Sequence, residues 1–181
     1  MAKRVIKGML SVSGIENMKK ELLNYKENEL TRLLDVFVQR LAEVGIPVIE
    51  QKMNDANITY DASGVEIGAD TSHLAVVKVN SFGDYARARL IVSGKDLFFI
   101  EFGAGTSFNG DVGSSPHPQG EEFGFTIGSY GKGYGARKVW GYYADSGELI
   151  LTRGVKATMP IYSAEMEIIL SVLKVAREVF G

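Results

Sequence analysis

The chain has 181 residues, of which 45% are hydrophobic and 23% are charged, a composition typical of a globular domain with one core. The formal net charge of −2 argues against a general electrostatic attraction to nucleic acid or to acidic membranes. Because the sequence contains no cysteine, disulfide frameworks, thiolate chemistry and cysteine-based metal centres are excluded.

The N-terminus is basic, but charged residues follow it where a signal peptide would carry its apolar segment. No stretch of the sequence approaches the roughly 18 consecutive apolar residues that a membrane-spanning helix needs. We therefore expect neither a signal peptide nor a membrane segment.

Residues 13–55 are predicted to be mainly helical, because apolar residues recur there at helical spacing behind a capping box formed by Ser13 and Glu16. Gly45 followed by Pro47 predicts that the main helix ends at this point, with a short further helical piece running to about Asn54. The apolar positions that define the stripe are Ile15, Met18, Leu22, Leu30, Leu33, Leu34, Phe37, Leu41 and Val44.

Short β-favouring runs predict an antiparallel sheet over 58–102 and 139–152. In the first part, residues 93–96 are predicted to form a hairpin turn between strands at 86–92 and 97–100. In the second part, a hairpin joins 139–143 to 149–152. The remaining predicted strands lie at 58–60 and 74–79.

Residues 160–180 are predicted to form a C-terminal helix. Pro160 stands in the first turn, where its missing N–H costs nothing, and Glu165 and Arg177 match the helix dipole. The elements together predict a single domain of the α+β class over 1–181. In this fold the antiparallel sheet packs with N-terminal and C-terminal amphipathic helices, and a long glycine-rich loop is inserted.

The inserted loop, residues 103–138, is the unusual part of the sequence. Loops longer than about 12–15 residues inside a compact domain are usually functional or disordered. One account is that the loop packs on its own domain as an Ω-type excursion. The other, which we favour because of the many glycines, is that its rings bury against a neighbouring subunit. The aromatic residues concerned are Phe102, Phe108, Phe123, Phe125, Tyr130 and Tyr134.

The sequence contains few of the residue types that catalytic or metal sites use. The two histidines are His73, which has no obvious partner, and His117, which has Glu121 and Glu122 a few residues on. Spacing permits a metal site at His117, but a loop imidazole making one hydrogen bond is the favoured interpretation. With no cysteine for a nucleophile–base pair, we predict a non-enzymatic protein without metal or cofactor.

A glycine pattern at 131–136 matches the dinucleotide fingerprint, but the residues after it read as a strand instead of the required helix. The basic residues Lys132, Arg137 and Lys138 are interpreted as a solubilising cluster, with contact to phosphates of channel DNA as the alternative. Alternation along the following strand places Trp140 and Tyr142 on one face and Tyr143 on the other, where Tyr143 is left for a partner.

Four segments occur in a fixed order along the chain: Phe99–Gly105, Ser115–Gln119 with Gly124 and Phe125 following, Trp140–Tyr143 with Thr152–Gly154 following, and Ala157–Ala164. In this order they resemble the tail-completion, or head–tail joining (neck), proteins of long-tailed phages and prophages. Two departures are Ala104, where threonine is usual, and Ile161 with Tyr162, where the family more often has Phe-Met.

The resemblance implies an α+β fold, no catalysis, and assembly of the subunit with itself into a ring, commonly a hexamer. Further implied partners are the head connector or adaptor and the tail tube or tail terminator proteins, with non-specific DNA contact in the channel and no membrane. The location would be the virion neck or tail, and the host cytoplasm during assembly. The expected interface residues are Phe102, Gly103, Gly105, Phe108, His117, Pro118, Phe123, Phe125, Tyr130, Tyr134 and Tyr143.

Two other classes stay open as alternatives. One is a small ligand- or metal-dependent enzyme that uses residues 103–138 as a lid over its site. The other is a nucleic-acid-binding module, for which the basic cluster would supply the phosphate contacts.

Overall fold

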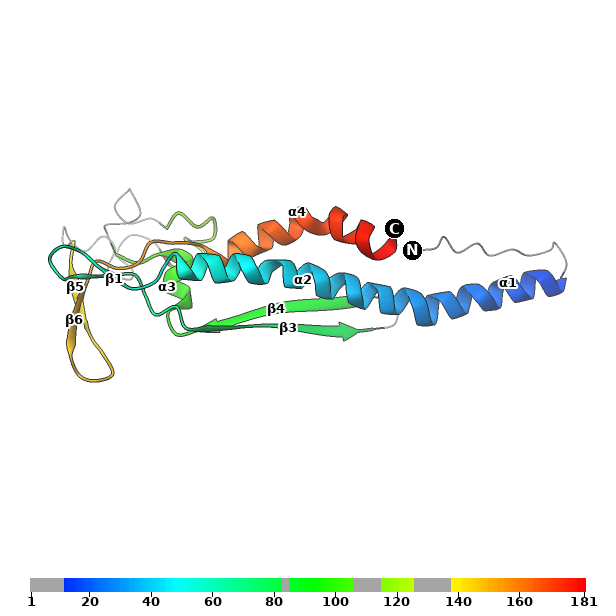
Figure 1. The fold of residues 1–181 in the computed structure, drawn as a ribbon, viewed down its shortest axis with the longest axis horizontal. Helices are drawn as coiled ribbons and strands as arrows, with labels where there is room; N and C mark the ends of the chain where they lie inside the picture. Colours follow the sequence, from blue (N-terminus) through cyan, green and yellow to red (C-terminus); the bar gives the residue numbers. More distant parts are fainter. Residues whose placement is uncertain (1–11, 83–84, 106–114, 126–137) are drawn as a thin grey trace. The chain divides into compact units, whose positions relative to one another are not determined.

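The computed structural model describes residues 12–82, 85–105, 115–125 and 138–181. Helix α1 (Val12–Asn24), a π-helical turn (Tyr25–Leu30) and helix α2 (Thr31–Asn54) follow one another without a break (Figure 1). With the strands of the middle region and helix α4 (Pro160–Phe180) at the end, the chain has the predicted α+β fold. In the part of the chain described, no helix is long and apolar enough to cross a membrane.

The prediction that the second helix ends at Gly45 is wrong, because α2 runs on through Pro47 to Asn54. Pro47 cannot donate a hydrogen bond to the carbonyl one turn earlier, which weakens the helix locally. This loss is offset by packing: Ile49 and Met53, in the last turns, are each only 1% exposed. The Thr158 hydroxyl also donates to the Lys52 carbonyl at 2.8 Å. Tertiary burial thus overrides the local stop signal.

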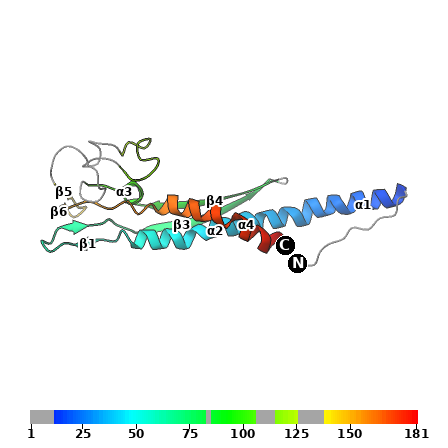
Figure 2. The same cartoon turned by 90° about the horizontal axis from the view of Figure 1, so that it is seen from above.

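The strands form two sheets and not the single antiparallel sheet that was predicted. One sheet has the order β1-β2-β6-β5 and contains a parallel pair, β2 with β6. The other consists of β3 and β4, which Figure 2 shows as neighbours. The hairpin of β5 and β6 is confirmed. The strand bounds are β1 Thr59–Tyr60, β2 Glu66–Ile67, β3 His73–Ser81, β4 Ala86–Gly94, β5 Trp140–Tyr143 and β6 Leu149–Thr152.

Residues 97–100 form no strand, so the hairpin predicted at 93–96 is also wrong: Ser93 and Gly94 belong to β4, and α3 (Leu97–Phe102) follows. The apolar run is too short for its period to separate strand from helix. Its buried positions Leu97, Ile100 and Glu101 follow helical spacing. Gly103 ends α3 at a φ of 78°, and its N–H donates to the Phe99 carbonyl at 2.7 Å.

The chain divides into two compact units. Unit 1 comprises residues 1–45, 76–91 and 167–181. Its core is formed where α2 meets the C-terminal part of α4: Leu33, Val175 and Val179 are buried there, and the rings of Phe37 and Phe180 lie 5.4 Å apart. The Ser81 hydroxyl donates to the Asp35 carboxylate at 2.6 Å, which ties β3 to α2 within this unit.

Unit 2 comprises residues 46–75 and 92–166. Its buried apolar side chains include residues of the end of α2, of α3, and of the segment between β6 and α4. Among the described residues of this unit, the largest side chains with less than 2% exposure are Ile49, Met53, Ile100 and Pro160.

A pair of backbone hydrogen bonds fastens the end of α3 to the segment after β6. Ala104 and Val155 exchange N–H to carbonyl bonds of 2.9 and 3.0 Å. The glycines beside them, Gly105 and Gly154, have φ values of +86° and +93°. A Cβ on Gly154 would lie 2.2 Å from the Ala104 carbonyl oxygen, so this close approach of two backbones requires glycine.

We therefore expect Gly154→Ala to lower the free energy of unfolding by about 3 kcal/mol, the sum of left-handed strain and overpacking. Gly64→Ala is the matched control, because Gly64 has a φ of +76° but nothing within 4 Å of its missing Cβ. Strain alone predicts a loss of about 1 kcal/mol there. Urea denaturation followed by circular dichroism measures both values, and equal losses would contradict the steric account.

Candidate functional site

The most elaborate side-chain arrangement surrounds Glu101, a buried residue of α3 with 4% exposure. One carboxylate oxygen accepts the Ile161 N–H at 2.7 Å, and the other accepts the Tyr162 N–H at 2.9 Å. These are orphan donors of the first turn of α4, so Glu101 caps that helix from a distant part of the chain. Just before the helix, Met159 has a φ of 54°, a strained conformation that the cap helps to hold.

His117 completes this arrangement. Its Nε2 lies 3.1 Å from Glu101 Oε1, and its Nδ1 accepts the Gln119 N–H at 3.0 Å. Because Nδ1 is an acceptor, Nε2 carries the proton and donates to the carboxylate. The histidine is buried and makes two hydrogen bonds instead of the single one predicted. Glu121 and Glu122, the partners that spacing had suggested, are exposed and belong to neither bond.

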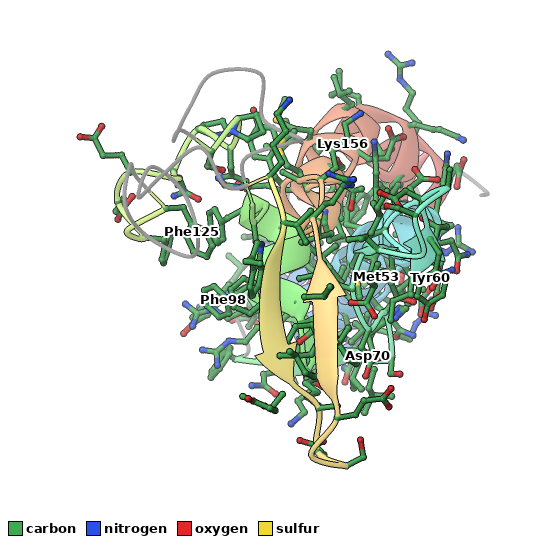
Figure 3. The ribbon with its side chains drawn as sticks, turned by 90° about the vertical axis from the view of Figure 1, so that its left-hand side faces the viewer. Met53, Tyr60, Asp70, Phe98, Phe125 and Lys156 are labelled. Atoms are coloured by element: carbon green, nitrogen blue, oxygen red, sulfur yellow. The ribbon has the colours of Figure 1, made fainter. Side chains whose placement is uncertain are left out.

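Aromatic rings pack around the pair and form, with Glu101 and His117, what we call the Glu101 cluster. The ring of Phe102 lies 4.5 Å from those of His117 and Phe125 and 5.2 Å from that of Phe123. The His117 ring lies 5.3 Å from that of Tyr162. Figure 3 shows Phe98 and Phe125 on the same side of α3. A cavity of about 190 Å³ opens among Phe98, Phe123, Tyr162 and the buried pair.

Residues 115–125 form a closed turn that carries His117 and Phe125 into the cluster. The Ser115 hydroxyl donates to the Phe102 carbonyl at 2.5 Å, and the Ser115 N–H donates to the Phe125 carbonyl at 3.4 Å. This part of the predicted loop packs on its own domain, as the Ω-type account expects.

Three of the four segments that carry the family resemblance meet at the Glu101 cluster. Phe99–Gly105 supplies Glu101 and Phe102, Ser115–Gln119 supplies His117, and Ala157–Ala164 supplies the capped helix start. Segments separated by up to about sixty residues of sequence thus act together in one place, as the 60-residue separation of the Glu101–Ile161 bond illustrates.

Among the described residues, no group of three or more His, Asp or Glu side chains is placed to hold a metal ion. His73, for which no partner was foreseen, donates its Nδ1–H to the Thr71 carbonyl oxygen at 2.8 Å. Its Nε2 lies 3.3 Å from Glu50 Oε1 without hydrogen-bond geometry.

The predicted interface residues fall into three groups. Phe102, Gly103, Gly105, His117 and Phe125 are buried within the subunit itself. Pro118, Phe123, Tyr143 and the basic Lys138 are exposed, with Phe123 47% and Tyr143 75% exposed. Phe108, Tyr130, Tyr134, Lys132 and Arg137 lie outside the described residues.

Another exposed apolar surface lies on α4, and it includes Ile169 and Leu173 of the apolar stripe that the sequence shows in this helix. Ile169, Leu170 and Leu173 are 55%, 73% and 70% exposed, whereas Val175 and Val179 of the same helix are buried. The α4 sequence is apolar around more than one face, so periodicity alone does not show which side is covered. We call Ile169, Leu170 and Leu173 the α4 outer face.

A second cavity, of about 290 Å³, lies between α3 and the four-stranded sheet. Trp140 and Tyr142 both line it and Tyr143 does not, as the strand alternation predicts. The Tyr142 hydroxyl donates to Glu66 Oε1 at 3.0 Å, and Glu66 is only 5% exposed. The Trp140 Nε1 is buried without a hydrogen-bond partner. We call this space the Glu66 cavity.

Burial and the hydrogen bond to Glu66 raise the pKa of Tyr142 to about 12. The ultraviolet titration curve of the Tyr142→Phe variant is subtracted from that of the wild type, and the difference reports the pKa of Tyr142 alone. The Glu66→Gln substitution is expected to move this pKa toward the ordinary value of about 10. Because the unfolded chain releases the phenolic proton first, Tyr142 makes stability fall as pH rises from about 10 to 12. A wild-type midpoint near 10 would contradict this geometry.

Comparison of the chain with protein-family models, with curated proteins and with solved structures finds no match in any of the three.

Proposed function

We propose that this chain is a structural virion-assembly protein of the neck or tail-completion type, without catalytic activity, from a long-tailed phage or prophage. Copies of it assemble into a ring at the head–tail junction. The ring joins the head connector or adaptor to the tail tube or tail terminator proteins. Support comes from the four sequence segments described above and from the apolar surfaces that the subunit leaves uncovered.

The observation that carries the proposal is the α4 outer face. Three large aliphatic side chains, each more than half exposed, lie close together on the last helix: Ile169 and Leu170 are adjacent in sequence, and Leu173 follows one turn later. A protein that functions as a monomer gains nothing from a contiguous apolar stripe in water, whereas an interface does. In a ring, this stripe on one copy packs against a different surface of the next copy, since rotation repeats a head-to-tail contact.

Helix α1 supplies a second uncovered surface. None of its described residues is buried, although Ile15 and Leu22 lie on one side of it and are 56% and 51% exposed. An amphipathic helix without a core contact in its own subunit needs a partner to cover its apolar side. We assign α1 to contacts with a neighbouring copy or with an adjacent neck protein.

Phe123 and Tyr143, the exposed rings among the described residues predicted to lie at the interface, are further candidates for hot spots on unit 2. The buried rings of the Glu101 cluster serve a different purpose in this account: they pack around the residue that caps the start of α4 within unit 2.

The proposal is tested by deleting the gene from a prophage-bearing strain that encodes it, inducing the prophage, and imaging the lysate by electron microscopy. We expect filled heads and separate tails, with joined particles restored by the gene supplied in trans. Joined, infectious particles in the deletion strain would overturn the proposal. The proposal would also be overturned if a variant that cannot self-associate restored joined particles in the deletion strain.

A further inference from the structure

The Glu66 cavity contains a buried acid that forms no ion pair with any of the described residues. Glu66 is 5% exposed, and its side chain accepts one hydrogen bond, from the neutral Tyr142 hydroxyl. Within the described residues, no lysine, arginine or histidine forms an ion pair with it. Arg153, the basic residue nearest in sequence to β6, is bound by Asp61 at 2.6 Å. A buried carboxylate left in this condition favours a cation that enters from outside.

A second acid faces the same space. Asp96 lines the cavity and is half-buried, and its Oδ2 accepts the Asp70 N–H at 3.0 Å. The neighbouring Lys95 interacts electrostatically with Asp96, but its amino group is exposed and bonded to Asp145 at 3.1 Å. Among the residues that the structure describes, the wall of the cavity therefore carries two acidic groups and no basic side chain.

Aromatic rings make up much of the remaining wall: Phe99, Trp140 and Tyr142. The faces of such rings attract cations, tryptophan most strongly, and acids with aromatic rings are the usual lining of sites for ammonium groups. The rest of the lining is small, including Gly68, Ala69 and Ala104, which leaves room for an aliphatic stem. Gly68 cannot be enlarged, because a Cβ there would lie 2.5 Å from the Asn57 carbonyl oxygen.

We propose that the Glu66 cavity binds an organic cation, an alkylammonium or alkylguanidinium group together with its apolar stem. Glu66 and Asp96 supply the negative charge, and the three rings cover the stem and the cation. Such a group occurs on free polyamines and on the basic side chains of proteins, and the experiment below separates these two sources. The inference does not depend on the proposed function.

Trp140 makes the proposal directly measurable, because it is the sole tryptophan of the chain and lines the cavity. Its fluorescence is titrated with butylguanidinium and with butylammonium, and with butylurea as the uncharged analogue. We expect a saturable change for the two cations, with a Kd on the order of 1 mM, and none for butylurea. No saturable change for either cation, or an equal response to butylurea, would overturn the proposal.

Variants test the assigned acids. Glu66→Gln keeps the hydrogen bond to Tyr142 and is expected to weaken cation binding at least about tenfold. Asp96→Asn provides an independent second variant with a smaller loss. Glu148→Gln, an exposed residue of the β5–β6 turn, removes the same charge outside the cavity and is the control. Unchanged binding in both Glu66→Gln and Asp96→Asn would contradict the assignment, and thermal unfolding checks that each variant is folded.

The two sources of the cation, a free small molecule and a basic side chain of a protein, are distinguished by comparing two compounds. Agmatine is a free small cation, and acetylarginine amide carries backbone atoms that mimic a protein residue. Tighter binding of agmatine identifies a small-molecule site. Equal or tighter binding of acetylarginine amide identifies a socket for the arginine of a partner chain. Failure of both compounds would count against the proposal.

Discussion

Replacing Leu170 and Leu173 together by glutamate is expected to convert the proposed ring into monomers. Both side chains are about 70% exposed in the subunit, at 73% and 70%, so the substitution removes little packing within the chain. In the proposed assembly each leucine would be buried, which contributes about 2 kcal/mol apiece, and the glutamates would in addition be buried without partners. The dissociation constant should therefore rise by about a thousandfold or more.

Sedimentation equilibrium measures this effect, and circular dichroism establishes that the double variant is folded. Arg32→Glu is the control, because it lowers the net charge by the same two units from an exposed position on α2. We expect Arg32→Glu to assemble as the wild type does. If the double variant assembled with unchanged affinity, the α4 outer face would have no part in the interface.

Replacing Glu101 by alanine is expected to lower the free energy of unfolding by about 3–5 kcal/mol. The change leaves the Ile161 and Tyr162 N–H groups and the His117 Nε2 without their acceptor, all within a buried site. It also removes the cap that offsets the strained backbone at Met159. Urea denaturation followed by circular dichroism gives the value.

Glu165→Ala is the matched control for this prediction, because Glu165 is an exposed carboxylate that lines the same cavity as Glu101. This substitution should change the free energy of unfolding by less than about 0.5 kcal/mol. Glu101→Gln separates charge from size: it retains an acceptor but turns an amide N–H₂ toward a helix N–H, so we expect an intermediate loss. A loss below about 1 kcal/mol for Glu101→Ala would show that the network contributes little.

The long helices and the β5–β6 hairpin could be predicted because their signals are local. The stripe in α4 spans many turns, and the hairpin is marked by Gly147 in the left-handed region, at a φ of +82°. Helix α3 could not be predicted, because the four-residue apolar run 97–100 fits either the helical or the strand period. The burial of Leu97, Ile100 and Glu101 is decided by the rest of unit 2. The helix stop at Gly45 failed for the same reason, since Ile49 and Met53 gain more from burial than Pro47 costs.

Less of the candidate sites than of the fold could be predicted from the sequence. His117 and Glu101 are 16 residues apart, and the backbone donors that Glu101 caps lie 60 and 61 residues beyond it, so no spacing rule connects them. The local search paired His117 with Glu121 and Glu122 because they are near in sequence. The sequence does contain a signal for the α4 outer face, because α4 has more apolar positions than one buried stripe needs. Only the structure shows which of these positions stay exposed.

The direct test of self-assembly is the mass of the wild-type protein in native mass spectrometry over a range of concentrations. We predict one dominant closed species of at least three copies, with a mass that is an integer multiple of the 19.8 kDa chain and a sixfold ring as the leading expectation. A mass of 19.8 kDa at every concentration, or an open series of sizes without a dominant species, would contradict assembly of this chain into a ring.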